Sequence, residues 1–264
     1  MKLSILGSGS EGNSTLLTSN QSAILIDAGF SGKEIQNRLD QTEISPHDIE
    51  AIVLSHEHGD HVKGAGVLAR RFKIPIYATE GTFRAGKVRM GAIPEAKIMP
   101  AGASVSFHDI RVTSFSVSHD ASDPVAFTIQ NDHKNTKIGI CTDLGYVTHL
   151  VRQRLQNCQT LILEMNHDLQ MLIAGRYPWD LKQRIRSKKG HLSNDDASAF
   201  LATIWNDSLN SVVIAHISKE NNLPELAELS ARNALDSLNH NGKTQIVSAL
   251  QNEITQITEK QKNE

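Results

Sequence analysis

Apolar residues in the first half of the chain occur in short runs separated by glycines and polar turn residues, a pattern typical of β-strands. The run at 51–54 is almost unbroken, as in a strand buried on both faces. Two pairs of runs flank polar turns like hairpins, 104–107 with 110–117 and 125–130 with 137–141. The remaining strands are expected at 3–6, 15–18, 23–26, 74–78, 160–163 and 211–215.

Segments with apolar residues spaced three and four apart lie between these strands and predict helices. They cover 33–39, 61–72, 147–156, 193–205 and 223–238. Ser193 is followed three residues later by Asp196, close to a capping-box pattern. Strands, hairpins and helices mixed throughout predict an α+β fold with sheets packed between helix layers. Because no repeat or linker interrupts the pattern, we expect a single domain over 1–264, with a polar tail at 258–264.

The composition narrows the class of protein. The 264 residues include 27 basic and 29 acidic ones, and the net charge of −2 argues against a wholesale polycation. No apolar run approaches the roughly 18 residues that span a bilayer. The two cysteines, Cys141 and Cys158, form no paired framework and fit a reducing compartment. We therefore expect a cytoplasmic protein without a membrane partner.

A glycine motif near the N-terminus matches a dinucleotide-binding pattern only superficially. Gly7, Gly9 and Gly12 have the required spacing after a strand, but a strand-like segment follows where a helix is needed. Asp27 follows Gly12 by 15 residues, where the motif requires an acidic residue about 20 further on. A tight turn within a hairpin is the better interpretation, and its glycines could let a substrate approach the backbone.

The strongest chemical signal is a cluster of histidines and carboxylates directly after the strand at 51–54. His56, His58, Asp60 and His61 offer four potential ligands within six residues. Neutral imidazole and carboxylate suit borderline divalent ions such as zinc. An extended backbone places His56 and His58 on one side, and the chain then turns into the next helix. This density makes a solvated loop with accidental histidines improbable.

Three further donors each follow a later apolar strand: His119, Asp143 and His216. A single histidine at a strand end is more often structural than a ligand. Taken in order, however, these residues complete two sites. His56, His58 and His119 can bind one ion, Asp60, His61 and His216 can bind a second, and Asp143 can bridge them.

This ordered set, with Asp27 in the apolar context of residues 25–29, resembles the metallo-β-lactamase fold superfamily. The resemblance implies a four-layer αββα sandwich with two divalent metal ions at one edge, and it makes Asp27 a supporting residue. Zinc, manganese and iron all suit the donors. True β-lactamases usually have a cysteine in place of Asp143, and Cys141 should point elsewhere. Glyoxalase-type thioesterases share the whole ligand pattern, so the ligands do not name the substrate.

Residues in the C-terminal half distinguish the branches of the superfamily. Residues 161–168, 177–185, 190–194 and 215–222 resemble the YycJ/WalJ (VicX) branch, described as 5′-to-3′ DNA exonucleases. Glu164 and the block at 190–193 also resemble the tRNA 3′-end-processing branch, in which a histidine held by a carboxylate assists phosphodiester cleavage. The resemblance implies attack by a metal-bridging hydroxide that Asp60 orients, with His191 and Glu164 as catalytic partners. His167 could support the site or have a structural role.

A basic segment leads into His191. Its charges could contact substrate phosphates or form an ordinary solvated helix face. Tyr177 and Trp179 nearby could stack on bases or pack against the protein. The segment consists of Lys182, Arg184, Arg186, Lys188 and Lys189, and a weaker patch consists of Arg84, Lys87 and Arg89.

Two other classes of function stay open beside a nuclease acting on DNA or RNA. A small-molecule hydrolase of the same fold, cleaving a thioester, lactone or cyclic phosphodiester, would have a closed pocket and would not need Lys188 and Lys189. A non-catalytic nucleic-acid-binding protein is disfavoured because seven metal ligands have little purpose in it. The isolated histidines are expected at the surface, namely His47, His108, His133, His149 and His240.

Overall fold

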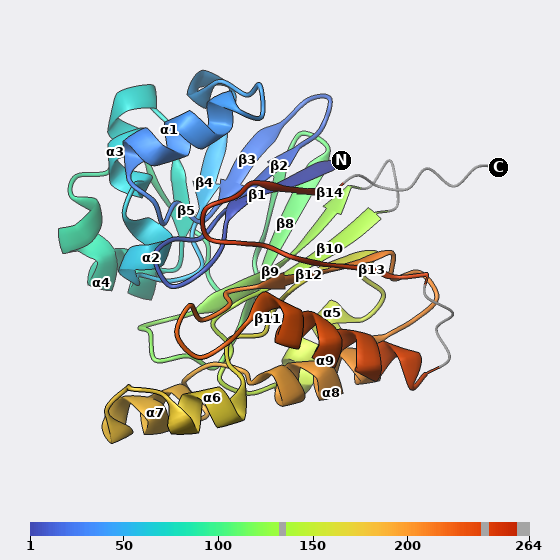
Figure 1. The fold of residues 1–264 in the computed structure, drawn as a ribbon. Helices are drawn as coiled ribbons and strands as arrows, with labels where there is room; N and C mark the ends of the chain where they lie inside the picture. Colours follow the sequence, from blue (N-terminus) through green and yellow to red (C-terminus); the bar gives the residue numbers. More distant parts are fainter. Residues whose placement is uncertain (132–135, 239–242, 258–264) are drawn as a thin grey trace.

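Two mixed β-sheets packed face to face, with helices on both outer sides, form the fold in a computed structural model (Figure 1). The structure describes residues 1–131, 136–238 and 243–257. This is the four-layer αββα arrangement predicted from the sequence. Residues 258–264, expected as a polar tail, lie outside the described part.

The first sheet has the strand order β14-β1-β2-β3-β4-β5-β6. Antiparallel pairing joins β14, β1, β2 and β3, and β3 to β6 run parallel. The predicted glycine turn joins β1 to β2 as a hairpin, as expected. The bounds are β1 (Lys2–Gly7), β2 (Ser14–Thr18), β3 (Ala23–Ile26), β4 (Ala51–Val53), β5 (Ile76–Ala78), β6 (Ala96–Ile98) and β14 (Thr255–Ile257).

The second sheet has the order β13-β12-β11-β10-β9-β8-β7. Both predicted hairpins are present, β7 with β8 and β9 with β10, and β10 to β13 run parallel. The bounds are β7 (Ser104–Phe107), β8 (Ile110–Ser116), β9 (Val125–Asn131), β10 (Thr136–Cys141), β11 (Thr160–Glu164), β12 (Ser211–Ala215) and β13 (Gln245–Ser248).

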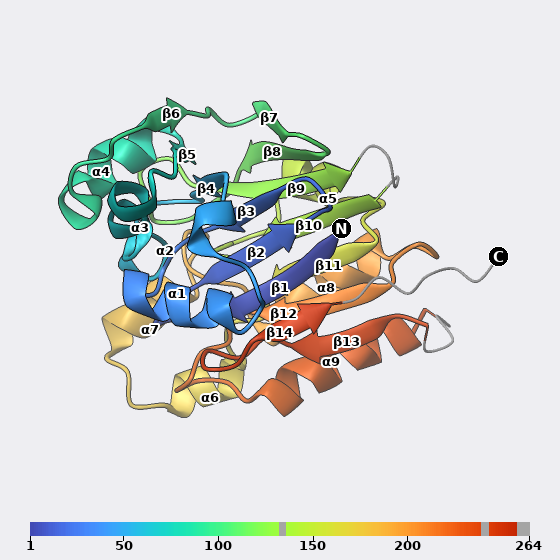
Figure 2. The same cartoon turned by 90° about the horizontal axis from the view of Figure 1, so that it is seen from above.

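Helices cover the outer face of each sheet, as Figure 2 shows from above. The first sheet carries α1 (Gly32–Asp40), η1 (Pro46–Asp48), α2 (Gly59–Val62), α3 (Ala65–Phe72) and α4 (Glu80–Met90). The second carries α5 (His149–Leu155), α8 (Asn194–Ile204) and α9 (Pro224–Asp236). An arm of α6 (Leu169–Ala174) and α7 (Trp179–Ile185) lies at the same end of the molecule as α2.

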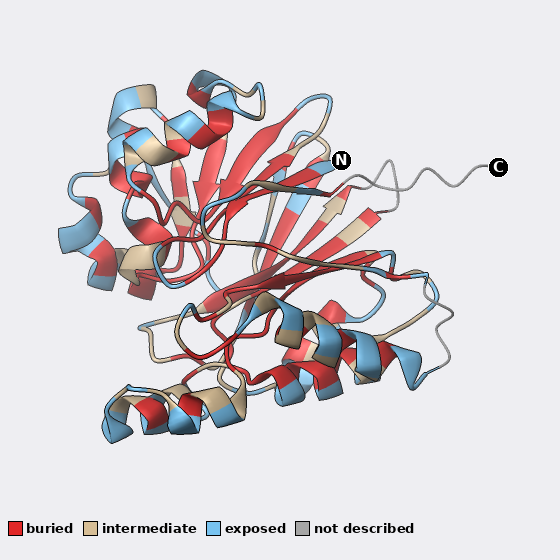
Figure 3. Ribbon diagram, in the orientation of Figure 1, coloured by how far each residue is buried: buried red, intermediate tan, exposed pale blue. Residues whose placement is uncertain are grey.

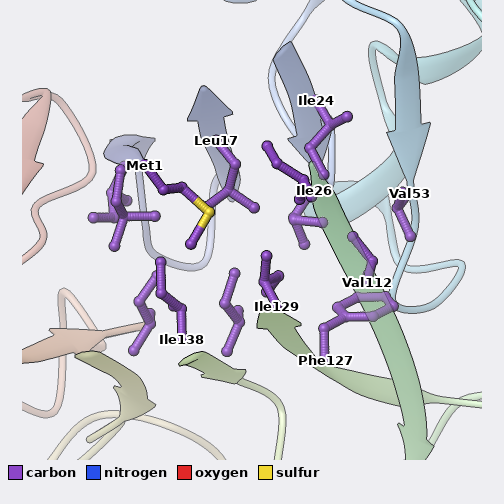
Figure 4. Packing of buried hydrophobic residues seen from close by; sticks show 14 of the residues in the cluster. Met1, Leu17, Ile24, Ile26, Val53, Val112, Phe127, Ile129 and Ile138 are labelled. Carbon is purple, nitrogen blue, oxygen red and sulfur yellow. The ribbon is translucent and has the colours of Figure 1, made fainter. Parts of the chain in front are cut away.

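Successive side chains along a strand point to opposite faces of its sheet, which divides the buried core into three layers. Ile24 and Ile26 point between the sheets, where they join Phe127 and Ile129 of the second sheet (Figure 4). Leu25 points the other way, into the layer beneath α1 and α3. Figure 3 shows the consequence: the sheets are buried, whereas the outer helix faces are exposed. Cys141 belongs to the apolar layer under α5 and α8, away from the histidines, as expected.

Several elements differ from the sequence prediction. The helix expected over 61–72 is two helices, because the Gly64 amide donates to the Ala28 carbonyl oxygen at 2.8 Å and not to the carbonyl oxygen four residues earlier. The strands β6, β13 and β14 were missed because they are short and partly polar. Helices α4 and α7 were missed because exposed and charged residues dilute their apolar periodicity, and α6 was missed because its six residues are too few to show a helical period. Ser193 caps α8 as predicted, accepting from the Asp196 amide.

In the described residues, no helix combines the length and apolar character that a membrane crossing requires.

Candidate active site

The carboxyl ends of several strands meet at one edge of the sandwich, where open α/β sheets commonly form their ligand sites. His56 and His58 follow β4, and His119 follows β8. From the parallel part of the second sheet, Asp143 follows β10 and His216 follows β12. Residues separated by up to 160 positions are thereby brought together.

Three of the residues at this edge adopt left-handed backbone conformations. The φ angles of Asp27, Asp143 and His216 are 60°, 57° and 54°. Asp and His tolerate this region better than most residues, but it still costs free energy. Each one comes at or just after a strand end, so the turn re-aims its side chain toward the edge of the sheet.

The first group of donors consists of His56, His58 and His119. One ligand atom from each lies within 4.8 Å of the others. The His58 Nδ1 and His119 Nε2 atoms are 3.3 Å apart, and the His56 ring centroid lies 4.6 Å from that of His58. Three imidazole nitrogens therefore converge on a volume of the size that one ion occupies.

The second group consists of Asp60, His61 and His216. The Nε2 atoms of His61 and His216 each lie 3.4 Å from Asp60 Oδ2. Asp143 stands between the two groups: its Oδ2 is 3.1 Å from His61 Nε2, and its Oδ1 is 3.6 Å from the Nε2 atoms of both His119 and His216. This is the central position that the sequence prediction gave to Asp143.

Hydrogen bonds on the far side of the rings orient these histidines. The Nδ1 atoms of His61 and His216 lie 2.8 Å from Asp27 Oδ2 and 2.9 Å from Glu164 Oε1. His119 Nδ1 lies 3.2 Å from the Gly190 carbonyl oxygen. An imidazole that donates from Nδ1 presents the lone pair of Nε2, the arrangement typical of metal-binding histidines.

The unpartnered atoms at the centre fit a cation. His56 Nε2 and Asp143 Oδ2 are buried without a hydrogen-bond partner. Asp143 Oδ2 faces His61 Nε2, whose ring already donates from Nδ1 to Asp27. Two lone-pair atoms 3.1 Å apart repel each other unless a proton or a metal ion lies between them. Imidazole and carboxylate donors without a thiolate suit a divalent metal ion.

The electrostatics agree with such a charge. Burial alone lowers the pKa of His61, but the carboxylates of Asp143, Asp27 and Asp60 outweigh it and hold the pKa well above 6.5. Burial alone raises the pKa of Asp143, yet the surrounding histidines hold it well below its ordinary value. The carboxylates therefore favour a cation in the cluster.

His191 and Glu164 lie beside the metal-binding groups. His191 Nδ1 is 2.7 Å from Glu164 Oε1, and Glu164 Oε2 accepts from the Leu144 amide at 2.9 Å. Burial opposes ionisation of Glu164, but His191 and His216 lower its pKa to about 2. Burial lowers the pKa of His191, and the Glu164 charge more than compensates. The His191 side chain is 19% exposed and lines a cavity of about 170 Å³.

Several polar residues in contact with the donors, among them Asn13 and Asp120, were not predicted from the sequence. The Asn13 amide nitrogen lies 3.2 Å from His61 Nε2 and 3.4 Å from Asp60 Oδ2. No local pattern in the sequence marks Asn13 as a site residue. Asp120 Oδ1 lies 3.3 Å from His119 Nε2, and its Oδ2 accepts from Arg184 at 2.5 Å.

One residue of the basic segment, Lys182, is buried, so its predicted contact with phosphate is wrong. Lys182 is only 8% exposed, and its Nζ donates to the carbonyl oxygens of Ile173 and Gly175 at 2.7 and 2.5 Å. It therefore closes the C-terminus of α6 and has no free ammonium for phosphate. The other four basic residues of the segment are exposed, as are Arg84, Lys87 and Arg89 on α4.

The remaining predicted histidines divide between surface and interior. His47, His108 and His149 are exposed, as expected, and His133 and His240 lie outside the described residues. His167 is buried but is not among the groups of converging donors. Burial lowers the pKa of His167 to about 4, and a β-bridge to Ser193 anchors its backbone.

Comparison with known proteins agrees with this architecture. Residues 22–217 match the family described as Beta-lactamase superfamily domain. The chain is 39% identical over 238 residues to exodeoxyribonuclease YycJ of Bacillus anthracis, covering 89% of each chain. It is 41% identical over 239 residues to exodeoxyribonuclease WalJ of Streptococcus pneumoniae (serotype 2, strain D39), covering 89% of this chain and 88% of the relative.

A solved structure shares the fold at low identity. The metallo-β-lactamase fold protein YhfI of Bacillus subtilis superposes with a TM-score of 0.73 at 14% identity, covering 97% of this chain and 99% of that one. Together with the family match and the two relatives, the sandwich and its edge of histidines and carboxylates lead to one conclusion. The chain belongs to the β-lactamase superfamily.

Proposed function

We propose that this protein is a metal-dependent exonuclease that degrades DNA from the 5′ end. The observation that carries the proposal is the placement of the His191–Glu164 pair directly beside two donor groups that share Asp143. The names of the two bacterial relatives, both exodeoxyribonucleases at about 40% identity, support DNA as the substrate.

The donors would hold two divalent ions, of zinc, manganese or iron. His56, His58 and His119 would hold one, Asp60, His61 and His216 the other, and Asp143 would contact both. Two such ions supply a nucleophile from water at neutral pH and neutralise charge on the phosphate. Asp27 would keep His61 in the required tautomer through the 2.8 Å contact at Nδ1.

The residues of the chain itself would act on protons and orientation. Asp60 is the more exposed of the two carboxylates among the predicted ligands, at 21% against 4% for Asp143, and would accept a hydrogen bond from the attacking water. His191 would donate from Nε2 to the phosphoryl or leaving oxygen, since Glu164 occupies its Nδ1. Glu164 would also fix His216, which couples the two roles.

The exposed basic residues would bind the phosphates. The loop that carries Lys188 and Lys189 contacts the donor loops directly: Ser118 Oγ donates to the Lys188 carbonyl oxygen at 2.7 Å. Gly190 in the same loop accepts from His119. These contacts support a role for Lys188 and Lys189 close to the cleavage site.

We further propose that the chain is a single domain acting in the cytoplasm. The interleaving of both sheets around one core supports the first part. The second is supported by Cys141 and Cys158, which are both free and buried.

A time course on end-labelled oligonucleotides tests the nuclease proposal. Single-stranded DNA and RNA of matched sequence carry a label at either end and are incubated with manganese and the wild-type protein or Asp60→Ala. We expect stepwise shortening from the 5′ end of DNA by the wild type alone. Intact substrates with both proteins, in manganese and in zinc, would contradict the proposal, and turnover of thioesters would then favour a small-molecule hydrolase.

A further inference from the structure

Two adjoining cavities lie on the His191 side of the donor groups. We propose that the larger one, of about 460 Å³, binds the terminal nucleoside of the DNA strand, with the Tyr177 ring stacked on its base. This inference rests on the proposed nuclease function and deepens it by naming where the end of the substrate is held. Its volume falls within the range of small-ligand pockets, about 300–1,000 Å³.

Shared walls connect the two cavities. The smaller one, of about 170 Å³, is bounded by His191 and Arg184. Ser10, Tyr177 and Ser218 line both. A strand whose phosphate lies beside His191 can therefore continue past Tyr177 into the larger cavity without leaving the protein surface.

The larger cavity also adjoins the donor residues through Ser8, which lines it. Ser8 Oγ accepts from the His216 amide at 2.8 Å and donates to Asn13 Oδ1 at 2.8 Å. Asn13 in turn contacts Asp60 and His61. The glycine turn that carries Ser8 and Ser10 thus forms the wall between the donor groups and the cavity, which gives this motif a role other than dinucleotide binding.

The chemistry of the larger cavity suits a base and sugar better than a phosphate. Ile217, Leu223 and Leu250 form apolar walls. Its charged residues are paired, Lys219 with Glu11 at 3.7 Å and Glu220 with Arg176 at 2.5 Å. The phosphates are left to Arg184 and His191 in the smaller cavity.

Contacts within the chain use two of the three side-chain amides that line the larger cavity, those of Gln251 and Asn222. Gln251 accepts from the Glu11 amide and donates to the Gly12 carbonyl oxygen. Asn222 donates to the Met165 carbonyl oxygen and to Asn194. Stacking and apolar contact remain, and these tolerate every base. A duplex end could enter only with its terminal base unpaired, so the cavity would hold a single nucleoside at the end of the strand.

Substrates with an abasic terminal residue test the stacking. The wild-type protein should remove a normal 5′ nucleotide with a KM about tenfold lower than that for an abasic 5′ residue, the range expected for one stacked base. Tyr177→Ala should remove both ends with similar KM values, whereas Tyr177→Phe should keep the discrimination. Equal slowing of both substrates by Tyr177→Ala would overturn the proposal.

Filling the cavity gives a second test. Leu223 and Leu229 are 49% and 53% exposed, but only Leu223 lines the cavity. Leu223→Trp should lower the ratio of DNA turnover to bis(p-nitrophenyl) phosphate turnover about tenfold, while the matched Leu229→Trp should not change it. An unchanged ratio in Leu223→Trp would also overturn the proposal.

A wrong nuclease function and a wrong cavity assignment give different experimental results. If the wild-type protein hydrolyses bis(p-nitrophenyl) phosphate but no DNA, the nuclease function is wrong, and the cavity proposal falls with it. If DNA is degraded but the abasic end and Leu223→Trp have no effect, the cavity proposal alone is wrong.

Discussion

At the scale of single residues, charge and backbone conformation select which side chains can occupy this edge. Asp27, Asp143 and His216 all have positive φ angles, which turn the chain away from the direction of the preceding strand at each of these positions. Their roles follow from their contacts: Asp27 faces the Nδ1 atom of His61, whereas Asp143 faces the Nε2 atoms that remain. A substitution that keeps the charge of one of these residues but does not adopt its left-handed backbone conformation should therefore also disrupt the donor groups.

The His191–Glu164 pair should act as a unit. His191→Ala should lower kcat on DNA about 10²–10⁴-fold, the usual loss when a general acid is removed. Glu164→Gln should cost at least as much, because it releases His216 as well. Steady-state kinetics on both variants and on the double variant checks this.

If the two residues are coupled, the double variant should be no slower than Glu164→Gln alone. Losses that simply multiply would contradict the coupling. Metal content measured on His191→Ala serves as the control, because His191 is not needed as a ligand in this account.

Lys182 should matter for stability. Lys182→Met leaves the carbonyl oxygens of Ile173 and Gly175 without their donor and should lower the free energy of unfolding by about 1–3 kcal/mol. Denaturant unfolding measures this. The salt dependence of DNA binding should not change, and a reduced salt slope in this variant would return Lys182 to the phosphate contacts.

At the scale of elements, the strands that lead into the donor residues and the loops that follow them could be predicted, whereas the short parallel strands β6 and β13 and the arm around the site could not. The strands before His56 and His216 are almost unbroken apolar runs, and the strand before Asp143 ends in the largely apolar residues 138–141, so the positions of all three were visible in the sequence. Helices α6 and α7 are short and largely exposed, and they depend on contacts such as those of Lys182 that no local pattern reveals. Asn13 was missed for the same reason, since only the fold brings it to Asp60.

The loop after α7 should carry the electrostatic grip on DNA. Replacing Lys188 and Lys189 together by Gln should weaken binding of single-stranded DNA and reduce the salt slope by about 1.4, at about 0.7 per lost phosphate contact. Fluorescence anisotropy at several salt concentrations, with Asp60→Ala as the background, measures this. Lys87→Gln with Arg89→Gln on α4 is the matched control, and an equal effect there would place the binding path elsewhere.

At the scale of the whole molecule, the same histidines affect both metal binding and the stability of the fold. Burial lowers the pKa values of His61, His191 and His216, but neighbouring carboxylates outweigh it and raise all three above 6.5. In the metal-free protein, protonation of these three histidines stabilises the folded state, and this stabilisation is fully present below about pH 6.5. It is lost as the pH rises through their raised pKa values in the folded state. Bound metal needs neutral imidazoles, so its contribution grows with pH.

The melting temperature should therefore change with opposite sign in the two forms. Between pH 6.5 and 8.5 we expect the Tm of the metal-free protein to fall by several degrees, which corresponds to a loss of about 1 kcal/mol or more in the free energy of unfolding. The Tm of the manganese-loaded protein should rise or stay level over the same range. Differential scanning calorimetry at matched salt measures both. Parallel curves would show that the histidines do not bind the metal.

The most direct test of the central claim is to count metal ions and activity together. Protein freed of metal by chelation is titrated with manganese, while native mass spectrometry reports bound ions and a 5′-labelled DNA strand reports cleavage. We expect no cleavage without metal and full cleavage as the second ion binds, and we expect Asp143→Asn to bind no second ion and to cleave no DNA. Full cleavage by metal-free protein, or by protein holding a single ion, would contradict a dinuclear centre that Asp143 joins.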